Sequence, residues 1–133
     1  SKSIASFLEK MDRERLEVAM KYGVSVRSVK EWHEDNYGIK GTNLFETLQK
    51  NSSYASLDAP RTLNHRYLTE DIPTGLVPIS ELGRAADVPT PYIDMIIELG
   101  NALLNIDFRK IGRNLRRLGL EGKTIDEIKR VFE

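Results

Sequence analysis

Apolar residues recur at helical spacing along most of the chain, and no segment alternates strictly between apolar and polar positions. The pattern predicts three helices in the first half, over residues 3–22, 25–37 and 43–49. Gly23 and Gly38 follow the first two, as glycine often does where a helix ends. The apolar residues expected on their inner faces are Ile4, Phe7, Leu8, Met11, Val18, Ala19, Tyr22, Val26, Val29, Trp32, Leu44, Phe45 and Leu48.

The second half carries the same spacing over residues 79–87, 91–105 and 108–119, and again after Thr124. The helix over 91–105 is apolar on most of its circumference, so we expect it to be buried on several sides at the centre of the core. Its narrow polar strip consists of Asp94, Glu98, Asn101 and Asn105. Inner faces of the other helices are expected at Ile79, Leu82, Ala85, Ala86, Phe108, Ile111, Leu115, Leu118, Ile128, Val131 and Phe132.

Together these elements predict an all-α fold, a helical bundle of six or seven helices in a single domain over residues 1–133. Residues 51–60 are polar and predict a loop anchored by Tyr54 and Leu57. The residues expected to cap helices are Ser25, Thr42 or Asn43, Thr90 ahead of Pro91, and Thr124 with Glu127.

Residues 64–78 combine ionisable side chains with proline and glycine. Ile72 precedes Pro73 and is therefore biased away from the helical region, which predicts a break at this point. Ionisable residues beside such a break are typical of a binding cleft, and equally of an exposed loop between helices. Chemistry alone leaves both interpretations open.

Composition narrows the class of protein. The 133 residues include 20 basic and 20 acidic side chains, so net charge gives no reason to expect a nucleic acid or an anionic membrane as partner. Cysteine is absent, which excludes disulfides and cysteine-ligated metals. No apolar run reaches the length of a membrane span and no secretory pattern opens the chain. We therefore expect a soluble, cytoplasmic protein.

Three kinds of site find no support in the sequence. The two histidines, His33 and His65, lack partners at the spacing of a helical metal site, so we expect no metal. No strand followed by a phosphate-cradling glycine loop is present, so we expect no nucleotide bound by this chain alone. A catalytic serine triad is likewise without support.

Residues 16–32 have the pattern of a DNA-binding helix-turn-helix, with a glycine turn and inward valines. The second helix of that pair, however, carries Glu31, Glu34 and Asp35 against Arg27 and Lys30. A DNA reader usually presents a basic face to phosphate. We therefore keep a DNA-binding or helical interaction module only as the alternative function.

Arg15 lies on the apolar stripe of the first helix, between Met11 and Val18. An arginine at the edge of such a stripe usually extends its guanidinium to water, and we favour that interpretation. The alternative is a guanidinium that points into a cleft.

Several segments resemble the octopine/nopaline (opine) dehydrogenase family, and the resemblance spans essentially the whole chain. The segments are Arg66 to Pro78 (RYLTEDIPTGLVP), residues 80–84 (SELGR), 88–91 (VPTP), 107–110 (DFRK) with Gly112 and Arg113, 118–120 (LGL), 12–15 (DRER), and Tyr54.

The resemblance implies that residues 1–133 are the C-terminal all-helical domain of such an enzyme. The fold it implies is similar to the C-terminal domain of 6-phosphogluconate-dehydrogenase-like enzymes. In this family an N-terminal Rossmann domain, absent from this chain, binds NAD or NADP. The family reaction reductively condenses a 2-oxo acid with the amine of an amino acid to an N-(carboxyalkyl) amino acid, so the isolated chain is expected to be inactive.

The resemblance also assigns roles to residues. In the family an arginine grips the 2-oxo acid and an aspartate five residues later pairs with a catalytic histidine; these match Arg66 and Asp71. The position of that histidine lies upstream of Ser1, and His65 is not assigned its role. Tyr54 and Tyr67 match positions near the amine pocket, with core or interdomain packing as an equal alternative. The structural alternatives are an ion pair with Glu70 for Arg66, and a helix N-cap for Asp71.

Two structural expectations follow. Because five residues of an ideal α-helix turn about 140°, Arg66 and Asp71 can share one concave surface only if the backbone leaves the helical path between Thr69 and Thr74. The family's nucleotide domain would cover part of this one, so we expect an exposed apolar face near Tyr54, Tyr67 and the start of the first helix. That face, or the helices themselves, would also allow a homodimer.

Overall fold

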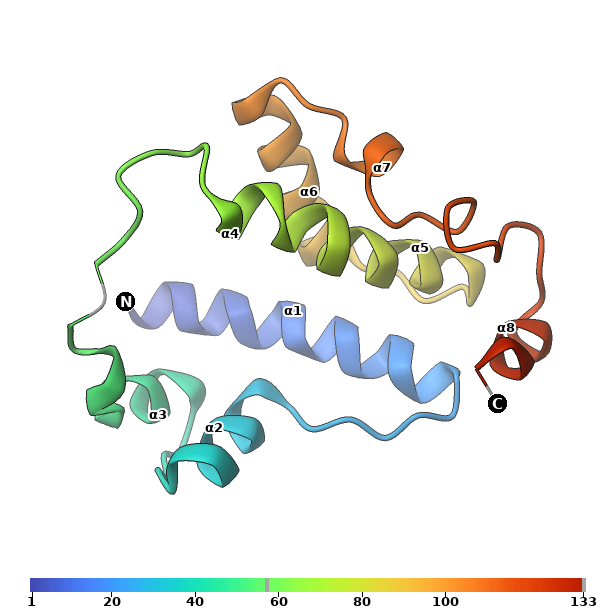
Figure 1. Cartoon of the computed structure of the whole chain (residues 1–133). Coiled ribbons are helices and arrows are strands. Elements are labelled where there is room, and N and C mark those ends of the chain that lie inside the picture. Colours follow the sequence, from blue (N-terminus) through green and yellow to red (C-terminus); the bar gives the residue numbers. More distant parts are fainter. Residues whose placement is uncertain (57, 133) are drawn as a thin grey trace.

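In the computed structural model, residues 1–56 and 58–132 are described, and all of their regular structure is helical (Figure 1). The all-α class is therefore confirmed, while Leu57, an expected loop anchor, lies outside the described residues. The elements in order are α1 (Lys2–Lys21), α2 (Val29–Tyr37), α3 (Leu44–Lys50), the 3₁₀ turn η1 (Ser52–Tyr54), α4 (Arg66–Thr69), the π-helix η2 (Ile72–Leu76), α5 (Val77–Ala85), α6 (Pro91–Leu104), α7 (Phe108–Ile111) and α8 (Ile125–Val131).

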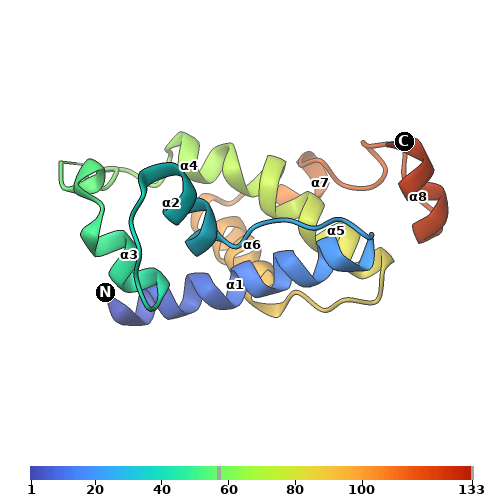
Figure 2. The same cartoon turned by 90° about the horizontal axis from the view of Figure 1, so that it is seen from below.

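Helix α1 is the central element. It lies between α2 and α3 on one side and the α4–η2–α5 rod, with α6 behind it, on the other (Figure 1). It packs against α3, α5 and α6. Figure 2 shows α8 at the far end of the molecule from the N-terminus. Since α1 has 20 residues, it separates the two ends by about 30 Å.

Two carboxylates of α1 fix the starts of the helices on one side. The backbone N–H of Leu44, the first residue of α3, donates to Glu9 at 2.8 Å. The backbone N–H of Val29, the first residue of α2, donates to Asp12 at 2.7 Å. The first N–H groups of a helix have no partner within it, so these carboxylates supply acceptors where a partial positive charge also favours them.

A third carboxylate of α1 does the same on the other side. Glu14, which is buried, accepts the backbone N–H groups of Tyr92 at 2.8 Å and Ile93 at 2.9 Å, in the first turn of α6. Thr90 was expected to cap this helix, but its side chain makes no capping hydrogen bond. The prediction of the start at Pro91 is confirmed, and that of the capping group is wrong.

Helix α2 begins later than expected. Ser28, not Ser25, is its N-cap, and forms a capping box with Glu31. The chain between α1 and α2 is extended rather than a tight turn, because Asp12 holds the start of α2 at Val29. The helix-turn-helix geometry is therefore absent. Val26 and Trp32, expected on the inner face, are exposed, and His33 is buried instead.

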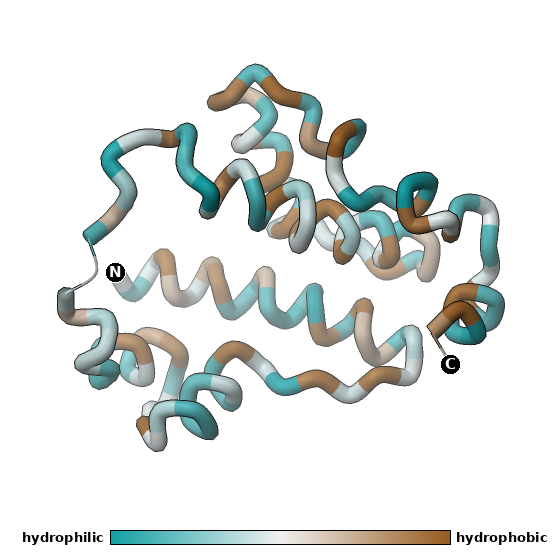
Figure 3. The backbone as a smooth tube through the Cα atoms, viewed as in Figure 1, coloured by the Kyte–Doolittle hydropathy of each residue, from teal (hydrophilic) through white to brown (hydrophobic). Residues whose placement is uncertain are grey.

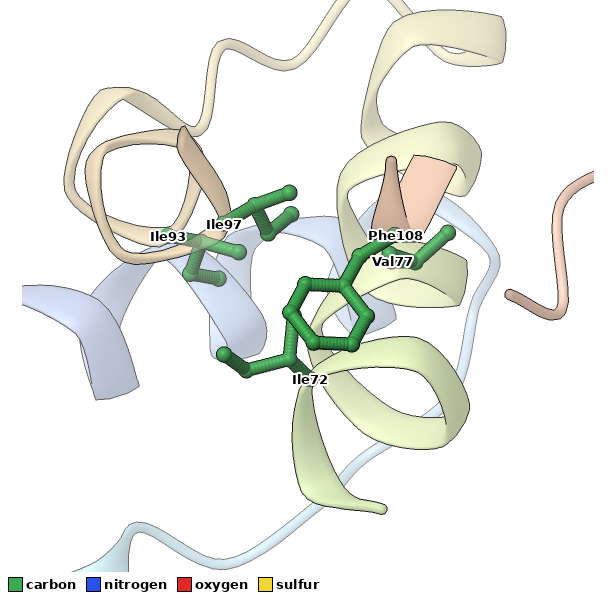
Figure 4. Packing of buried hydrophobic residues seen from close by; sticks show 5 residues of the cluster. All are labelled: Ile72, Val77, Ile93, Ile97 and Phe108. Carbon is green, nitrogen blue, oxygen red and sulfur yellow. The ribbon is translucent and has the colours of Figure 1, made fainter. Parts of the chain in front are cut away.

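The central core joins η2, α5, α6 and α7. Its buried cluster comprises Ile72, Val77, Ile93, Ile97 and Phe108 (Figure 4). Apolar and polar residues alternate along the helices of the backbone trace, as one-sided burial requires (Figure 3). Phe108 lies beside Ile72 in the close view, so α7 closes the core against the π-helix.

Helix α6 is buried on one face rather than on several. Ile93, Ile97 and Gly100 are buried, as expected. A Cβ at Gly100 would lie 2.6 Å from Ile72 Cδ1, so glycine permits this close packing. Met95, Leu99 and Leu103, at four-residue spacing, remain about half exposed along the opposite side. The expectation of burial on several sides is therefore wrong for this chain.

The helix predicted over 108–119 is limited to Phe108–Ile111. Asn114 supplies the physical reason, because its side chain donates to the carbonyl of Arg109 at 2.8 Å and accepts the N–H of Arg117 at 3.0 Å. Side-chain bonds of this kind replace the helical ones. Further along, the capping box of Thr124 and Glu127 is confirmed. In α8, Ile128 is buried as expected, whereas the expected inner residues Val131 and Phe132 are exposed.

Residues 1–56 and 58–132 contain neither a membrane-spanning helix nor a metal-binding cluster. None of the helices described there is long and apolar enough to cross a membrane. No group of three or more His, Asp or Glu side chains there could hold a metal ion.

The first prediction concerns Glu14. Glu14→Ala leaves two buried N–H groups of α6 without acceptors, and should lower the free energy of unfolding by about 2–4 kcal/mol. Glu14→Gln keeps an acceptor and should cost about 1 kcal/mol. Urea unfolding followed by circular dichroism measures both. Glu17→Ala, an exposed residue of the same helix, is the matched control; equal losses for Glu14→Ala and Glu17→Ala would contradict the capping role.

The second prediction concerns pH. His33 is buried among the rings of Trp32, Tyr37 and Tyr54, and burial lowers its pKa. The unfolded chain, with an ordinary histidine pKa of about 6.5, then binds the proton more readily than the folded one. The His33 contribution to stability is therefore full above about pH 6.5 and falls as pH drops towards the lowered folded pKa.

Urea unfolding of wild type and His33→Phe at pH 7.5 and 5.5 measures this contribution. The carboxylates titrate in both proteins, so their contribution cancels in the comparison. The wild type should therefore lose more stability between pH 7.5 and 5.5 than the variant, by the contribution of His33. An identical loss in the two proteins would show that His33 does not couple folding to protons.

Candidate functional site

The segment from Arg66 to Leu76 stays on a helical path. Helix α4 ends at Thr69, and the backbone angles of Glu70 (φ −109°, ψ −54°) and Asp71 (φ −69°, ψ −35°) remain right-handed helical. The chain then continues as the π-helix η2 directly into α5. An irregular segment between Thr69 and Thr74 is thus confirmed, but the break before Pro73 is wrong.

The prolines account for the π-helix. Pro73 has no N–H to donate to the preceding turn, and an α-helix normally kinks or ends there. Here the N–H of Val77 donates to the carbonyl of Ile72, five residues back, which widens one turn and accommodates the ring. Thr74 secures the turn, because its N–H and Oγ1 both donate to the carbonyl of Glu70, at 3.0 Å and 2.7 Å. Such π-turns inside helices are frequent at functional sites.

Arg66 is exposed and forms an ion pair with Glu70 that includes one hydrogen bond, from Nη2. Its Nε lies 3.2 Å from Oε2 and its Nη2 lies 3.3 Å from Oε1. The side chains are 72% and 52% exposed. An exposed pair four residues apart on a helix contributes only about 0.3–0.5 kcal/mol. The ion pair with Glu70, the structural alternative for Arg66, is therefore present in this chain, but it is weak.

Asp71 is exposed and directly precedes η2, and its side chain makes no capping hydrogen bond. Asp71 thus occupies the N-cap position named as its structural alternative, but its side chain does not cap the helix. Because the path is helical, Arg66 and Asp71 are rotated apart rather than converging at a break. The concave surface expected from a break is not produced by the backbone.

Tyr67 lies on the exposed side of α4. It is 57% exposed, and its ring packs edge-on against His65, with ring centroids 4.5 Å apart. His65 is the N-cap of α4, and its Nδ1 accepts the N–H of Tyr67 at 3.3 Å. His65 therefore has a structural role in starting the helix.

Tyr54 belongs to a different part of the molecule. It is half-buried, with its ring 5.6 Å from that of His33 and 6.0 Å from that of Tyr37. Burial, and after it a hydrogen bond with Tyr37, raises the pKa of Tyr54. The neighbouring helix α3 and helix α4 lie on opposite sides of the N-terminal end of α1 (Figure 1). The packing alternative for Tyr54 is thus the arrangement in this chain.

Exposed apolar residues occur at the N-terminal end of α1, where an exposed apolar face was expected, although Ile4 and Leu8 were themselves expected on the inner face. Ile4, Leu8 and Leu63 are exposed along with Tyr67, while Tyr54 contributes less because it is half-buried. An apolar face of this kind marks an interaction surface.

Arg15 does not simply extend to water. Its guanidinium donates to Asp12 at 2.7 Å and 2.9 Å and to the carbonyl of Arg27 at 2.6 Å, which ties α1 to the segment before α2. It also borders a groove of about 770 Å³ between α1, α5 and α8, with mainly apolar walls such as Val18, Ile79 and Leu82. None of Tyr54, Arg66, Tyr67 and Asp71 lines this groove.

A partly buried polar network that the sequence did not predict joins α5, α6 and α7. Arg109 donates to Ser80 at 2.9 Å, to Asp94 at 2.8 Å and to Glu98 at 2.9 Å. Burial would raise the pKa of Asp94, but the hydrogen bonds from Ser80 and Arg109 outweigh it and hold that pKa below its ordinary value. The spacing of Asp94 and Glu98 on an otherwise apolar helix was the available signal, since a partly buried carboxylate such as Asp94 favours a cation beside it.

Comparison with known proteins agrees with this architecture. The family described as NAD/NADP octopine/nopaline dehydrogenase, alpha-helical domain, matches residues 1–104. The chain is 45% identical over 131 residues to the opine dehydrogenase of Arthrobacter sp. (strain 1C), covering 98% of this chain and 36% of that protein. It is 31% identical over 122 residues to protein ocs of Agrobacterium vitis, covering 92% and 34%.

A solved structure of octopine dehydrogenase with NADH and L-arginine has the same fold, with a TM-score of 0.76 over 96% of this chain and 39% of that one, at 23% identity. The chain spans about a third of the length of the curated relatives that it matches. Since the family match covers most of the chain, this protein belongs to the NAD/NADP octopine/nopaline dehydrogenase family and corresponds to its alpha-helical domain.

Proposed function

We propose that this chain is the substrate-binding part of an NAD(P)-dependent opine dehydrogenase that condenses a 2-oxo acid with the amine of an amino acid. The observation that carries the proposal is the segment Arg66–Asp71. In this member of the enzyme family, the Arg66 guanidinium and the Asp71 carboxylate, which makes no capping hydrogen bond, are exposed to solvent beside a π-turn. The isolated chain would be inactive.

Arg66 would bind the carboxylate of the 2-oxo acid. A guanidinium makes two parallel charge-assisted bonds to a carboxylate, which fixes the orientation of the bound acid. The guanidinium already faces a carboxylate, that of Glu70, through one hydrogen bond from Nη2 and a close contact of Nε. Because that pair is exposed and weak, a substrate carboxylate can replace Glu70 at little cost.

Asp71 would orient a histidine supplied by the part of the enzyme outside this chain. A carboxylate bonded to one ring nitrogen sets the tautomer, and stabilises the imidazolium that forms when the other nitrogen accepts a proton. An exposed aspartate without a capping bond can meet such a partner. Tyr67, exposed on the same segment, would face the amine. Tyr54, which packs with His33 in a separate aromatic cluster, would contribute to packing rather than to the amine contact.

The cofactor would be held elsewhere in the enzyme. A dinucleotide pyrophosphate is usually bound by a strand, a glycine-rich turn and a helix, and residues 1–56 and 58–132 contain no strand. NAD or NADP would therefore occupy a Rossmann domain, which supplies the hydride for reduction of the imine. The apolar face formed by Ile4, Leu8, Leu63 and Tyr67 would contact that domain.

We also propose that the enzyme is a cytoplasmic homodimer. The absence of cysteine suits a reducing compartment. Met95, Leu99 and Leu103 form a half-exposed apolar ridge along α6. Under a two-fold axis at Leu99, Met95 of one copy would pack against Leu103 of the other. Sedimentation of the complete enzyme should give a dimer that Leu99→Lys dissociates; a wild-type monomer at high concentration would contradict the interface.

Kinetics of the enzyme completed with its nucleotide domain test the roles of Arg66 and Asp71. Arg66→Lys loses the two-bond geometry and should mainly raise KM for the 2-oxo acid, by about ten- to a hundredfold. Asp71→Asn should leave KM nearly unchanged and lower kcat by about two to four orders of magnitude, because the histidine loses its orienting carboxylate. Steady-state oxidation of NADH or NADPH measures both effects.

Arg27 and Asp35 provide matched controls, because they form an exposed ion pair at 2.9 Å in another part of the chain. Arg27→Lys and Asp35→Asn should leave both kinetic constants within about twofold of wild type. Wild-type kinetics in Arg66→Lys and Asp71→Asn would refute the site assignment.

A further inference from the structure

The carbonyl of Pro73 lacks a partner within its own helix. In η2 the N–H of Val77 is used by the carbonyl of Ile72, five residues back. The same spacing would give the carbonyl of Pro73 the N–H of residue 78, but that residue is Pro78 and has none. Pro73 is buried, so its carbonyl needs a donor from another part of the chain.

Arg113 supplies that donor. Its backbone N–H donates to the carbonyl of Pro73 at 2.8 Å. The approach depends on Gly112, because a Cβ there would lie 2.7 Å from the Pro73 carbonyl oxygen and 2.6 Å from that of Phe108. Both obstacles are backbone atoms, which no side-chain movement relieves.

The requirement at Gly112 is close approach, not an unusual backbone conformation. Its φ of −75° is accessible to any residue. A substitution would therefore act by pushing the segment Phe108–Arg113 away from η2. The same segment also contacts η2 through Phe108, whose ring packs in the core with Ile72 (Figure 4).

We propose that Gly112 and Arg113 position Asp71 for catalysis. Asp71 is the residue immediately before Ile72 and Pro73, so the direction of its carboxylate depends on where these two residues are held. The Arg113 hydrogen bond and the Phe108 ring fix both of them. This inference rests on the proposed function of Asp71, and it makes Gly112 and Arg113 positioning residues that do not touch the substrate.

Kinetics of the completed enzyme test the proposal, with Gly112→Ala made alone and together with Asp71→Asn. A displacement of about 1 Å at a catalytic group can cost about a hundredfold in rate, so Gly112→Ala should lower kcat by about ten- to a hundredfold with a smaller change in KM. In the Asp71→Asn background the same substitution should lower kcat by less than about threefold, because no carboxylate remains to be displaced.

Gly41→Ala is the matched control, because a Cβ there would also meet backbone, 2.7 Å from the N of Thr47, on the other side of α1. It should reduce stability without this dependence on Asp71. If Gly112→Ala yields no folded enzyme, Phe108→Leu can be used instead, because it weakens the contact of the same segment with Ile72. It should lower kcat by less than Gly112→Ala would, and again only when Asp71 is present.

The outcomes separate the two proposals. Wild-type kcat in Asp71→Asn would overturn the catalytic role of Asp71 itself, and with it the positioning role. If Asp71→Asn is slow, but Gly112→Ala or Phe108→Leu lowers kcat in that background as much as in wild type, the positioning role alone is overturned. An unchanged kcat in folded Gly112→Ala would overturn it as well.

Discussion

Three carboxylates on one helix determine how the rest of this domain is arranged. Glu9, Asp12 and Glu14 of α1 accept backbone N–H groups at the starts of α3, α2 and α6. Each bond satisfies donors that the capped helix cannot satisfy itself and places negative charge at its positive end. These contacts, rather than a continuous apolar stripe, set where the flanking helices begin, and α6 in turn carries the core face against which η2 and α7 pack.

The segment proposed to bind substrate, Arg66–Asp71, is supported by that core. Ile72 and Phe108 join η2 to α7 in the buried cluster, and Arg113 completes the hydrogen bonding of Pro73. The side chains facing solvent from the same segment, Arg66 and Asp71, are left without strong partners. A rigid inner face and an exposed ionic outer face are what a substrate site at a domain boundary needs, since rigidity keeps the ionic groups in place when the substrate arrives.

The sequence was sufficient where the physics is local. Helical spacing located α1, α3 and α6, and the pair Thr124 and Glu127 identified a capping box. It failed where distant groups decide: Glu14, 78 residues away, replaces Thr90 as the cap of α6, and Asp12 moves the start of α2 from Ser25 to Val29. Pro73 predicted a break because local rules ignore the π-turn closed by the bond from Val77 to Ile72 and the distant donor, Arg113, that satisfies the Pro73 carbonyl. For the site, Arg66, Tyr67 and Asp71 share one segment, whereas Tyr54 packs in another cluster.

The central claim is that this helical domain supplies the substrate side of an opine dehydrogenase and depends on a nucleotide domain for chemistry. The most direct measurement is NAD(P)H oxidation in the presence of a 2-oxo acid and an amino acid, with the product identified by mass spectrometry. The chain joined to its nucleotide domain should form an N-(carboxyalkyl) amino acid, and the chain alone should oxidise nothing. Turnover by the chain alone, or no condensation product from the completed enzyme across a panel of oxo acids and amino acids, would contradict the account.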